Sequence, residues 1–352
     1  MQDEKNILVV RLSSLGDVLM TIPAVIAIKN HLPGAHVSWL IEGPVGDFLS
    51  YQGFVEKVIR FPRKKVVNNL KNGYLKEAFG LLRGFVRELR AIEYDLILDF
   101  HGILKSIILS KIARGKRLIG FDNTYAKEKS HLLYDERIKG TDKRLHKVER
   151  NMLIANYLGA GRGIPDTGLT VPQRYLGYID DFFKEAGILG DIFAINPFSS
   201  PGSGFKRWGF DRYVQLIRKI RAQLGVYILI LWGPGEKEEA EALVKESGRG
   251  VFLACPTDIS QLFALLKRVK LYISGDTGVM HLAASAKTPV VAIFGPTDHR
   301  INAPYGTDSM VVRKDIACSP CKNRGCKNRI CLDSITADEV FQAVQTMYKR
   351  NK

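Results

Sequence analysis

The sequence predicts an α/β protein with two Rossmann-like domains, whose parallel sheets face a central cleft. Strand-like and helix-like segments alternate up to residue 158. A Gly- and Pro-rich stretch at 159–165 interrupts this pattern, which starts again at residue 192. The chain has 352 residues, more than one hydrophobic core usually organises, so two domains are expected.

In the first half, short apolar runs predict buried strands, and apolar residues at helical spacing predict helices. The expected elements are strands at 7–12, 36–41, 55–60, 95–100 and 118–120, and helices from about 13 to 30 and at 75–92, 102–112 and 148–158. Strands that alternate with helices form parallel sheets with helices on their faces.

The second half repeats the pattern. Strands are expected at 192–196, 226–232, 250–254, 271–274 and 289–294, and helices at 210–224, 237–247, 259–269, 279–285 and 336–348. Thr336 and Glu339 fit a capping box at the start of the last helix. The expected domains are therefore 1–165 and 191–335, joined by a linker at 166–190 with one short helix at 178–186, and followed by a C-terminal helix at 336–352.

Composition narrows the class of protein. The sequence is 46% hydrophobic and 25% charged, as in ordinary globular proteins, and it has no apolar run long enough for a transmembrane helix. The start MQDEKNILVVRL is unlike a secretory signal, so a cytoplasmic location is expected. A net charge of +16 favours acidic partners, namely nucleic acid, an anionic membrane or a phosphorylated substrate, although any single basic cluster is equally well a solvated face. Nucleic acid is not expected, because we find no basic groove lined with aromatic residues.

Two loops of the first half carry candidate chemistry, since ligands of parallel sheets bind beyond the carboxyl ends of the strands. The loop RLSSLGD contains Asp17, and LDFHGILKS contains Asp99, His101 and Lys105. A carboxylate near a substrate hydroxyl can act as a general base. Alternatively, Asp17 is only an acid that favours the start of a helix.

In the second half, SGDTG at 274–278 leads from a strand into a helix. Backbone N–H groups at a helix start attract anions such as a diphosphate. Asp276 would orient a ribose hydroxyl, cap the helix or hold the loop, and His281 lies near the first turn, where it could equally be a packing residue. Ser199, Ser200 and Lys206 follow the strand at 192–196. Together with the loops GPGE and GPTD, these segments predict a nucleotide site.

Five motifs, in this order, resemble the ADP-heptose:lipopolysaccharide heptosyltransferases: RLSSLGDVLMTIP, LDFHGILKS, FKRWGFDRY, SGDTGVMHLAA and FGPTD. The resemblance spans nearly the whole chain. It implies a GT-B fold and an inverting transfer of L-glycero-D-manno-heptose from ADP-heptose to the lipopolysaccharide inner core. The acceptor implied is Kdo-lipid A or heptosyl-Kdo-lipid A. It further implies an enzyme at the cytoplasmic face of the inner membrane that needs no cofactor. We also expect a monomer, and the net positive charge favours an anionic membrane surface as partner.

The resemblance also implies roles for individual residues. Asp17 would be the general base, and Lys206 would act in catalysis by contacting the donor phosphates. Donor-binding residues would be Ser199, Ser200, Lys206, Glu236 (or Glu238 if the alignment slips), Asp276, Thr277, Gly278 and His281. Acceptor-binding residues would be Ser14, Gly16, Arg60, Arg63, Lys64, His101 and Lys105.

A cysteine cluster near the C-terminus resembles a Cys-rich loop of some family members, particularly those similar to the second heptosyltransferase. Its members are Cys318, Cys321, Cys326 and Cys331. The spacing is compatible with zinc, an iron–sulfur cluster or reduced thiols, and we expect no metal. The alternatives to heptose transfer are another GT-B nucleotide-sugar transferase, an epimerase, or a non-catalytic binding role.

Overall fold

The computed structural model describes residues 5–200, 202–321 and 323–351. The chain divides into two compact units, Met1–Thr170 and Val171–Lys352. The division falls inside the segment expected as a linker. The outermost residues of the expected domains, 1–4 and 352, lie outside the described residues.

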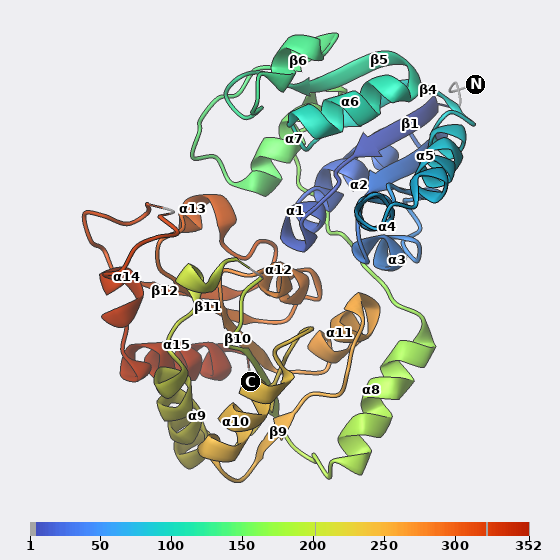
Figure 1. Cartoon of the computed structure of the whole chain (residues 1–352). Coiled ribbons are helices and arrows are strands. Elements are labelled where there is room, and N and C mark those ends of the chain that lie inside the picture. Colours follow the sequence, from blue (N-terminus) through green and yellow to red (C-terminus); the bar gives the residue numbers. More distant parts are fainter. Residues whose placement is uncertain (1–4, 201, 322, 352) are drawn as a thin grey trace. The chain divides into compact units, whose positions relative to one another are not determined.

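The first unit contains a six-stranded parallel sheet (Figure 1). Its strand order is β3-β2-β1-β4-β5-β6. The strands are β1 (Lys5–Val10), β2 (Ala35–Ile41), β3 (Lys57–Arg60), β4 (Glu93–Asp99), β5 (Arg114–Phe121) and β6 (Glu136–Ile138). The central strand β1 is buried from Ile7 to Val10, as expected where helices cover both faces of a sheet.

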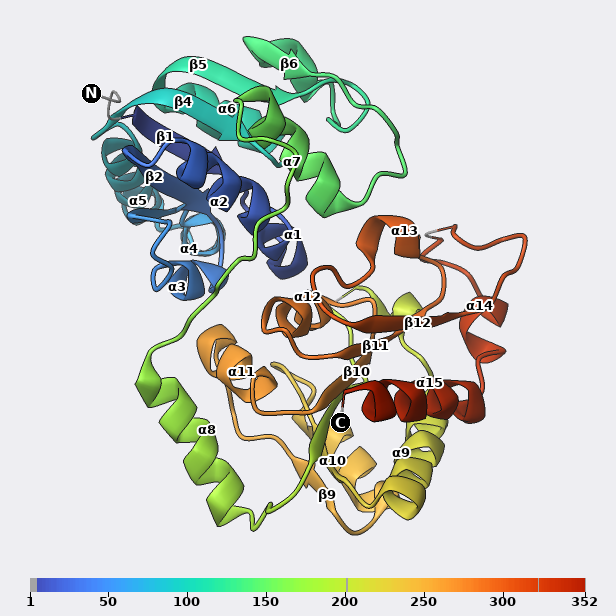
Figure 2. The same cartoon turned by 180° about the vertical axis from the view of Figure 1, so that it is seen from behind.

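Helices cover both faces of this sheet. They are α1 (Leu15–Leu19), α2 (Ile22–His31), α3 (Val45–Leu49), α4 (Arg63–Lys71), α5 (Leu75–Leu89), α6 (Leu104–Ile112) and α7 (Lys147–Tyr157), with the 3-10 helix η1 (Ser130–Leu133). Figure 1 shows α5 and α6 over one face, and Figure 2 shows α2 and α7 over the other. Phe85 and Leu89 of α5 and Ile107 of α6 pack on the sheet in one core cluster.

The first helix differs from the expectation of one continuous helix. It is divided into α1 and α2, and Pro23 is the second residue of α2. Proline has no N–H to continue a helical ladder, which explains the break. Asn151 of α7 fixes this junction, because its side-chain amide donates to the Met20 carbonyl at 2.9 Å and to the Thr21 hydroxyl at 3.1 Å. The break leaves Asp17 on a one-turn helix directly after β1.

The second unit contains another six-stranded parallel sheet, with the order β12-β11-β10-β7-β8-β9. The strands are β7 (Ile192–Asn196), β8 (Tyr227–Ile230), β9 (Val251–Leu253), β10 (Leu271–Gly275), β11 (Val290–Phe294) and β12 (Ser309–Arg313). Strands β7, β10 and β11 are buried along their whole length. Two parallel sheets in α/β units confirm the predicted fold class.

The helices of this unit are α8 (Gln173–Glu185), α9 (Phe210–Leu224), α10 (Lys237–Ser247), α11 (Ile259–Leu266), α12 (Gly278–Ser285), α13 (His299–Asn302), α14 (Ile330–Asp333) and α15 (Ala337–Arg350), with the 3-10 helix η2 (Gly204–Lys206). Residues of α9, α10 and α15 form one core cluster against the sheet. The capping box of α15 is confirmed, because the Thr336 hydroxyl accepts from the Glu339 N–H and the Glu339 carboxylate accepts from the Thr336 N–H.

Several elements differ from the sequence expectations. Helix α8 begins at Gln173, five residues before the expected start, and packs against α11 of the second unit. Helix α4 and strands β6 and β12 were not expected at all. Among the described residues, no helix is both long enough and apolar enough to cross a membrane.

Candidate functional site

In the first unit, the sheet brings two of the predicted loops together. Strands β1 and β4 are parallel neighbours, with Val10 opposite Asp99, so the loops that follow them start side by side. The backbone N–H of Leu12 in the first loop donates to Nδ1 of His101 in the second, at 3.2 Å. Asp17 and His101 consequently line the same cavity.

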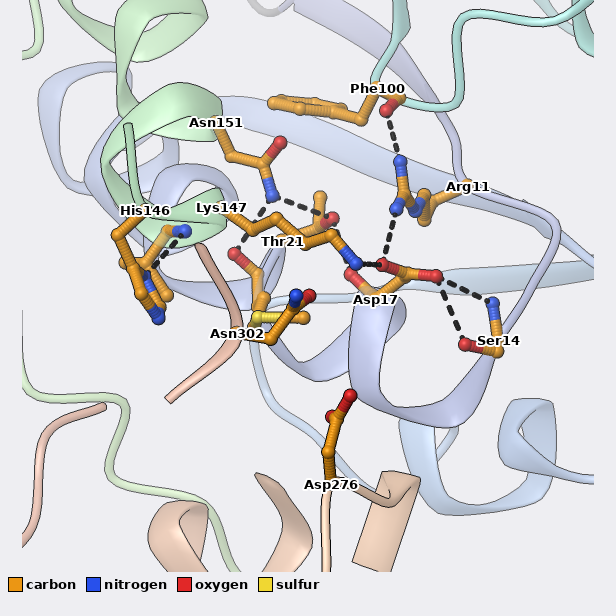
Figure 3. Close-up of polar contacts among 12 residues, drawn as sticks. Arg11, Ser14, Asp17, Thr21, Phe100, His146, Lys147, Asn151, Asp276 and Asn302 are labelled. Carbon is orange, nitrogen blue, oxygen red and sulfur yellow. Dashed lines mark hydrogen bonds and ion pairs between the residues drawn. The ribbon is translucent and has the colours of Figure 1, made fainter. Parts of the chain in front are cut away.

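Asp17 lies between two cations (Figure 3). Its Oδ1 is 3.0 Å from a guanidinium nitrogen of Arg11 and 2.7 Å from Nζ of Lys147. Its Oδ2 accepts from the hydroxyl of Ser14 at 3.0 Å and from the Ser14 N–H at 3.4 Å. The contact from Ser14 is the helix-start arrangement that the sequence allowed, but the ion pairs go beyond it, because Lys147 comes from α7.

These contacts determine the protonation state of Asp17. Burial alone would raise the pKa of its carboxyl group, but the charges of Arg11 and Lys147 and the hydrogen bonds from Lys147 and Ser14 outweigh burial and hold that pKa well below its ordinary range. Asp17 is therefore a carboxylate at any physiological pH. Its side chain keeps 22% of its exposure, so a ligand in the cavity can reach it.

The cavity has a volume of about 150 Å³ and is strongly cationic. Asp17 is the single carboxylate among the described residues that line it, against four Lys and Arg side chains. Its lining consists of Arg11, Asp17, Phe100, His101, Ile103, Phe121, Tyr125, Lys127, Lys147, Arg150 and Asn151. Such a lining suits an anionic ligand that presents a hydroxyl group to the carboxylate.

A buried carboxylate supports the second loop. Asp99 is fully buried, and its oxygens accept from the N–H groups of His101 and Gly102 and from the hydroxyls of Ser106 and Tyr134, at 2.7–3.1 Å. Burial raises the pKa of Asp99, against the effect of these hydrogen bonds. Burial and the nearby Arg11 lower the pKa of His101 to about 3, so the imidazole is neutral and accepts from Leu12.

The other predicted acceptor residues lie elsewhere in the first unit. Arg60 ends β3 and pairs with Asp47 at 2.6 Å, while Lys105 pairs with Glu42 at 2.8 Å. Arg63 and Lys64 are exposed on the first turn of α4. None of these four cations lines the cavity around Asp17.

In the second unit, the loops after β7 and β10 meet. Nζ of Lys206 is 2.7 Å from Oδ2 of Asp276, whose side chain is only 10% exposed. The carbonyl of Lys206 also lies 3.3 Å from the position that a Cβ on Gly275 would take, so the two loops approach closely because residue 275 is glycine. Lys206 and the 276–278 turn thus form one surface at the carboxyl edge of the sheet.

Thr277, and not Asp276, caps α12. Its hydroxyl accepts from the N–H of Met280 at 3.3 Å. Asp276 instead forms the ion pair with Lys206. The charge of Lys206 neutralises the Asp276 carboxylate, which would otherwise repel an anion. The N–H groups at the start of α12 can then bind a phosphate.

Three further residues predicted to bind the donor differ in their exposure to solvent: Ser199, Ser200 and His281. Ser199 is buried, and its Oγ has no hydrogen-bond partner among the described residues, whereas Ser200 is exposed. His281 is buried within α12. Ser199 thus has an unused hydroxyl after β7.

Glu236 is the N-cap residue of α10 and is tied into its own loop. Its Oε2 accepts from the N–H of Gly233 at 2.8 Å, and Arg207 lies 3.4 Å from Oε1. Burial raises the pKa of Glu236, while these two contacts lower it. Glu238 and Glu239 lie in the first turn of α10 and are exposed.

The cysteine segment packs against the loop after β11. The Pro296 carbonyl accepts from the Cys321 N–H at 2.9 Å, and the Gly295 carbonyl accepts from the Ser319 hydroxyl at 2.7 Å. Cys318 and Cys321 are exposed and Cys331 is buried. Within the described residues, no group of three or more His, Cys, Asp or Glu side chains is arranged to hold a metal ion.

Sequence reasoning missed most of the cations around Asp17. Lys147 and Arg150 belong to a basic run at 143–150, and Arg11 begins the first motif, but the sequence assigns none of them to the site. Lys147 and Asp17 are separated by 130 residues, and only the packing of α7 against α2 brings them together.

Comparison with known proteins gives consistent relatives. The sequence profile of glycosyltransferase family 9 (heptosyltransferase) matches residues 82–331. Lipopolysaccharide heptosyltransferase 1 of Escherichia coli is 27% identical over 88% of this chain and 93% of its own length. Lipooligosaccharide heptosyltransferase 2 of Campylobacter jejuni is also 27% identical, over 88% and 87%. The structure of E. coli heptosyltransferase WaaC with ADP superposes with a TM-score of 0.79 at 25% identity, covering 97% of this chain and 99% of that one.

Proposed function

Because the chain belongs to glycosyltransferase family 9, the heptosyltransferases of lipopolysaccharide core biosynthesis, we propose that it transfers L-glycero-D-manno-heptose from ADP-heptose to the inner core. The acceptor is Kdo-lipid A or heptosyl-Kdo-lipid A, since the chain is equally identical to a first and a second heptosyltransferase. The enzyme works as a monomer, peripherally bound at the cytoplasmic face of the inner membrane.

The observation that carries this proposal is Asp17 in its cationic cavity. The carboxylate takes the proton of the acceptor hydroxyl while the acceptor oxygen forms a bond to the anomeric carbon of heptose. The bond between that carbon and the diphosphate oxygen breaks, and its electron pair leaves with ADP. Attack opposite the leaving group inverts the anomeric configuration.

A carboxylate with such a low pKa is a weak base. The cations that lower this pKa, Arg11 and Lys147, also explain how Asp17 can still act as the general base. An acceptor with its own carboxylate or phosphate groups competes with Asp17 for Arg11 and Lys147. Each contact that shifts to the acceptor raises the pKa of Asp17. The base therefore becomes stronger when the correct anionic acceptor is bound, and the hydroxyl becomes more acidic as its bond to carbon forms.

The donor belongs to the second unit. Lys206 and the N–H groups at Thr277 and Gly278 bind the diphosphate and stabilise the charge that develops on the leaving ADP. The hydroxyls of Ser199 and Ser200 add hydrogen bonds, and Glu236 accepts from a ribose hydroxyl. Asp276 holds Lys206 in position.

The acceptor contacts proposed beyond the cavity are Ser14, Gly16, Arg60, Arg63, Lys64 and Lys105. Arg60 and Lys105 would exchange their present partners Asp47 and Glu42 for acceptor phosphates. His101 stays neutral and contacts the acceptor as a hydrogen-bonding group.

The test is to incubate the purified protein with ADP-heptose and one acceptor at a time, either Kdo-lipid A or heptosyl-Kdo-lipid A. We expect one acceptor to gain the mass of a single heptose, with release of ADP and with an anomeric configuration in the product that is inverted relative to the donor. UDP- and GDP-sugars serve as controls. Transfer from either of these in preference to ADP-heptose, or a product of retained configuration, would contradict the proposal.

A further inference from the structure

The hairpin of α4 and α5, residues 63–89, exposes an unusual set of large apolar side chains. Val67, Leu70, Tyr74, Leu75 and Phe79 are 41% to 69% exposed. They lie within thirteen residues of the chain, on two helices that are in contact with each other and on the turn between them (Figure 1). Apolar side chains gathered in this way mark an interaction surface more often than scattered single ones.

These side chains are not needed for the core, because the hairpin already packs through other residues. Val66 is the buried residue of α4, and Ala78, Phe85 and Leu89 are those of α5. Phe61 and Phe85 have ring centroids 5.0 Å apart under the hairpin. The exposed apolar residues thus form a second face of the same two helices.

The charge of the hairpin points to its partner. Its seven Lys and Arg residues and two Glu residues give it a net charge of +5. Within the part of the chain that the structure describes, none of the seven cations forms an ion pair with a carboxylate; they are Arg63, Lys64, Lys65, Lys71, Lys76, Arg83 and Arg87. On the neighbouring helix α6, by contrast, Lys105 pairs with Glu42 and Lys111 pairs with Asp135.

We infer that this hairpin, residues 63–89, is the surface by which the protein docks on an anionic lipid bilayer. Leu70, Leu75 and Phe79 enter the boundary between headgroups and acyl chains. Arg63 and Lys64 are the proposed acceptor contacts, and the other five unpaired cations contact lipid phosphates: Lys65, Lys71, Lys76, Arg83 and Arg87. The inference rests on the proposed function insofar as that function places the enzyme at a membrane. A second copy of the chain is a poorer occupant, because it would bring two faces of charge +5 together.

A second exposed apolar group provides an internal control. Leu104 and Ile108 of α6 and Leu132 and Leu133 of η1 are 44% to 56% exposed. The two cations of α6, Lys105 and Lys111, are already paired with acids, and Lys129 at the start of η1 is an exposed cation without such a pair among the described residues. If exposed apolar area alone were sufficient for binding, both groups would bind the bilayer. If a dense cluster of unpaired cations is needed as well, only the hairpin would bind it.

The experiment is vesicle flotation of the full chain without substrates. Vesicles contain phosphatidylcholine alone or with phosphatidylglycerol. One variant is Leu70→Ser/Leu75→Ser/Phe79→Ser, and another is Lys65→Gln/Lys71→Gln/Lys76→Gln, which leaves Arg63 and Lys64 intact. The matched controls are Leu132→Ser/Leu133→Ser and Lys184→Gln/Lys245→Gln/Lys349→Gln, the latter removing the same charge from exposed positions of the second unit.

We expect the wild type to float with anionic vesicles only, and to lose binding as salt is raised. The Lys triple variant should reduce vesicle affinity by roughly 100-fold, since each of the three cations near an anionic surface contributes a factor of about five. The Leu/Phe triple variant should reduce it at least as much, and both controls should bind as the wild type does. Unfolding curves that match the wild type show that the variants are folded.

The inference is overturned if the wild type does not float, if both hairpin variants float as well as the wild type, or if the controls lose binding equally. It is also overturned if the hairpin variants turn a wild-type dimer into a monomer in gel filtration. Heptose transfer to a delipidated, soluble acceptor separates this inference from the proposed function. Hairpin variants that keep this transfer but lose vesicle binding support both, whereas flotation without any transfer contradicts only the proposed function.

Discussion

Each unit places an acid at the junction between a central strand and a helix, but the two acids are held differently. Asp17 follows β1 and contacts two cations, Arg11 and Lys147, the second of them from a distant helix. Asp276 follows β10 and contacts one cation, Lys206, from the neighbouring loop. Asp17 shares its cavity with further cations, whereas Asp276 adjoins a helix start with free N–H groups.

This difference shows how each of the two sites can contain a carboxylate and still bind an anion. Asp276 is neutralised one to one, so the amides of Thr277 and Gly278 remain available to a phosphate. Asp17 is outnumbered by positive charge, so it stays ionised and yet lies in a cavity that attracts an anion. We therefore assign proton transfer to the first acid and the positioning of Lys206 to the second, and the predictions below test this division.

The largest effect is expected for Asp17→Asn. An amide cannot take the acceptor proton, so kcat for heptose transfer should fall by roughly 100- to 10,000-fold. The rate is followed by mass spectrometry of the acceptor at saturating substrates. The control Asp181→Asn, an exposed acid on α8, should leave the rate unchanged. A kcat for Asp17→Asn close to that of the wild type would remove Asp17 from the chemistry.

Lys206→Gln should have the next largest effect, on the donor side. Loss of a charged hydrogen bond to the diphosphate should lower kcat/KM for ADP-heptose by about 10- to 100-fold, while KM for the acceptor stays the same. Initial rates at varied donor concentration measure this. Lys237→Gln, an exposed change on α10, is the matched control. Equal kcat/KM values for the two variants would exclude Lys206 from the donor site.

Lys147→Met sharpens the comparison through pH. Asp17 has a depressed pKa when the protein is folded, so its ionisation stabilises the fold above the ordinary pKa of 3.8, and this stabilisation is lost as the pH falls toward the folded-state value. Without Lys147 the pKa of Asp17 should rise by about 1 to 3 units.

Since this rise still leaves the pKa of Asp17 below its ordinary value, the carboxylate should stay ionised down to about pH 5 in both proteins. The difference is expected in acid unfolding between about pH 5 and pH 2, followed by circular dichroism, where the variant should lose less stability than the wild type. Equal losses of stability in the two proteins would mean that Lys147 does not set the charge state of Asp17.

Much of the fold could be predicted from sequence, because buried strands such as 192–196 and amphipathic helices such as 210–224 have local periodicity. Strands β6 and β12 were missed because neither has a buried apolar run: β6 has the sequence ERI, and no residue of β12 is fully buried. Helix α4, with the sequence RKKVVNNLK, has a single buried residue and hence no apolar stripe.

The site was predicted only in part for a related reason. The four residues lie in the segments between a strand and the next long helix, so their positions near the sheet edges could be foreseen: Asp17, His101, Lys206 and Asp276. The partners of Asp17 could not, because Lys147 reaches it through the packing of α7 on α2. Such tertiary contacts leave no local pattern in the sequence. The choice of Thr277 over Asp276 as the helix cap likewise depends on the backbone conformation of the turn, which the sequence alone does not determine.

The smallest effect is expected for Gly275→Ala. The added methyl group would lie 3.3 Å from the Lys206 carbonyl, which is tight for a carbon contact, so the loop after β7 must shift by a few tenths of an ångström. We expect a loss of stability of about 1 to 3 kcal/mol in thermal unfolding and a few-fold weaker donor binding. Gly204→Ala, with open space around the new methyl group, is the control. Unchanged unfolding in Gly275→Ala would show that the two loops are not tightly coupled.

We assign proton transfer to Asp17 and the positioning of Lys206 in the donor site to Asp276. The most direct test of this assignment is calorimetric titration of ADP into the wild type, Asp17→Asn and Lys206→Gln. The account predicts that Asp17→Asn binds ADP within about twofold of the wild type, and that Lys206→Gln binds it roughly 10- to 100-fold more weakly. A loss of ADP affinity in Asp17→Asn as large as that in Lys206→Gln would contradict the account.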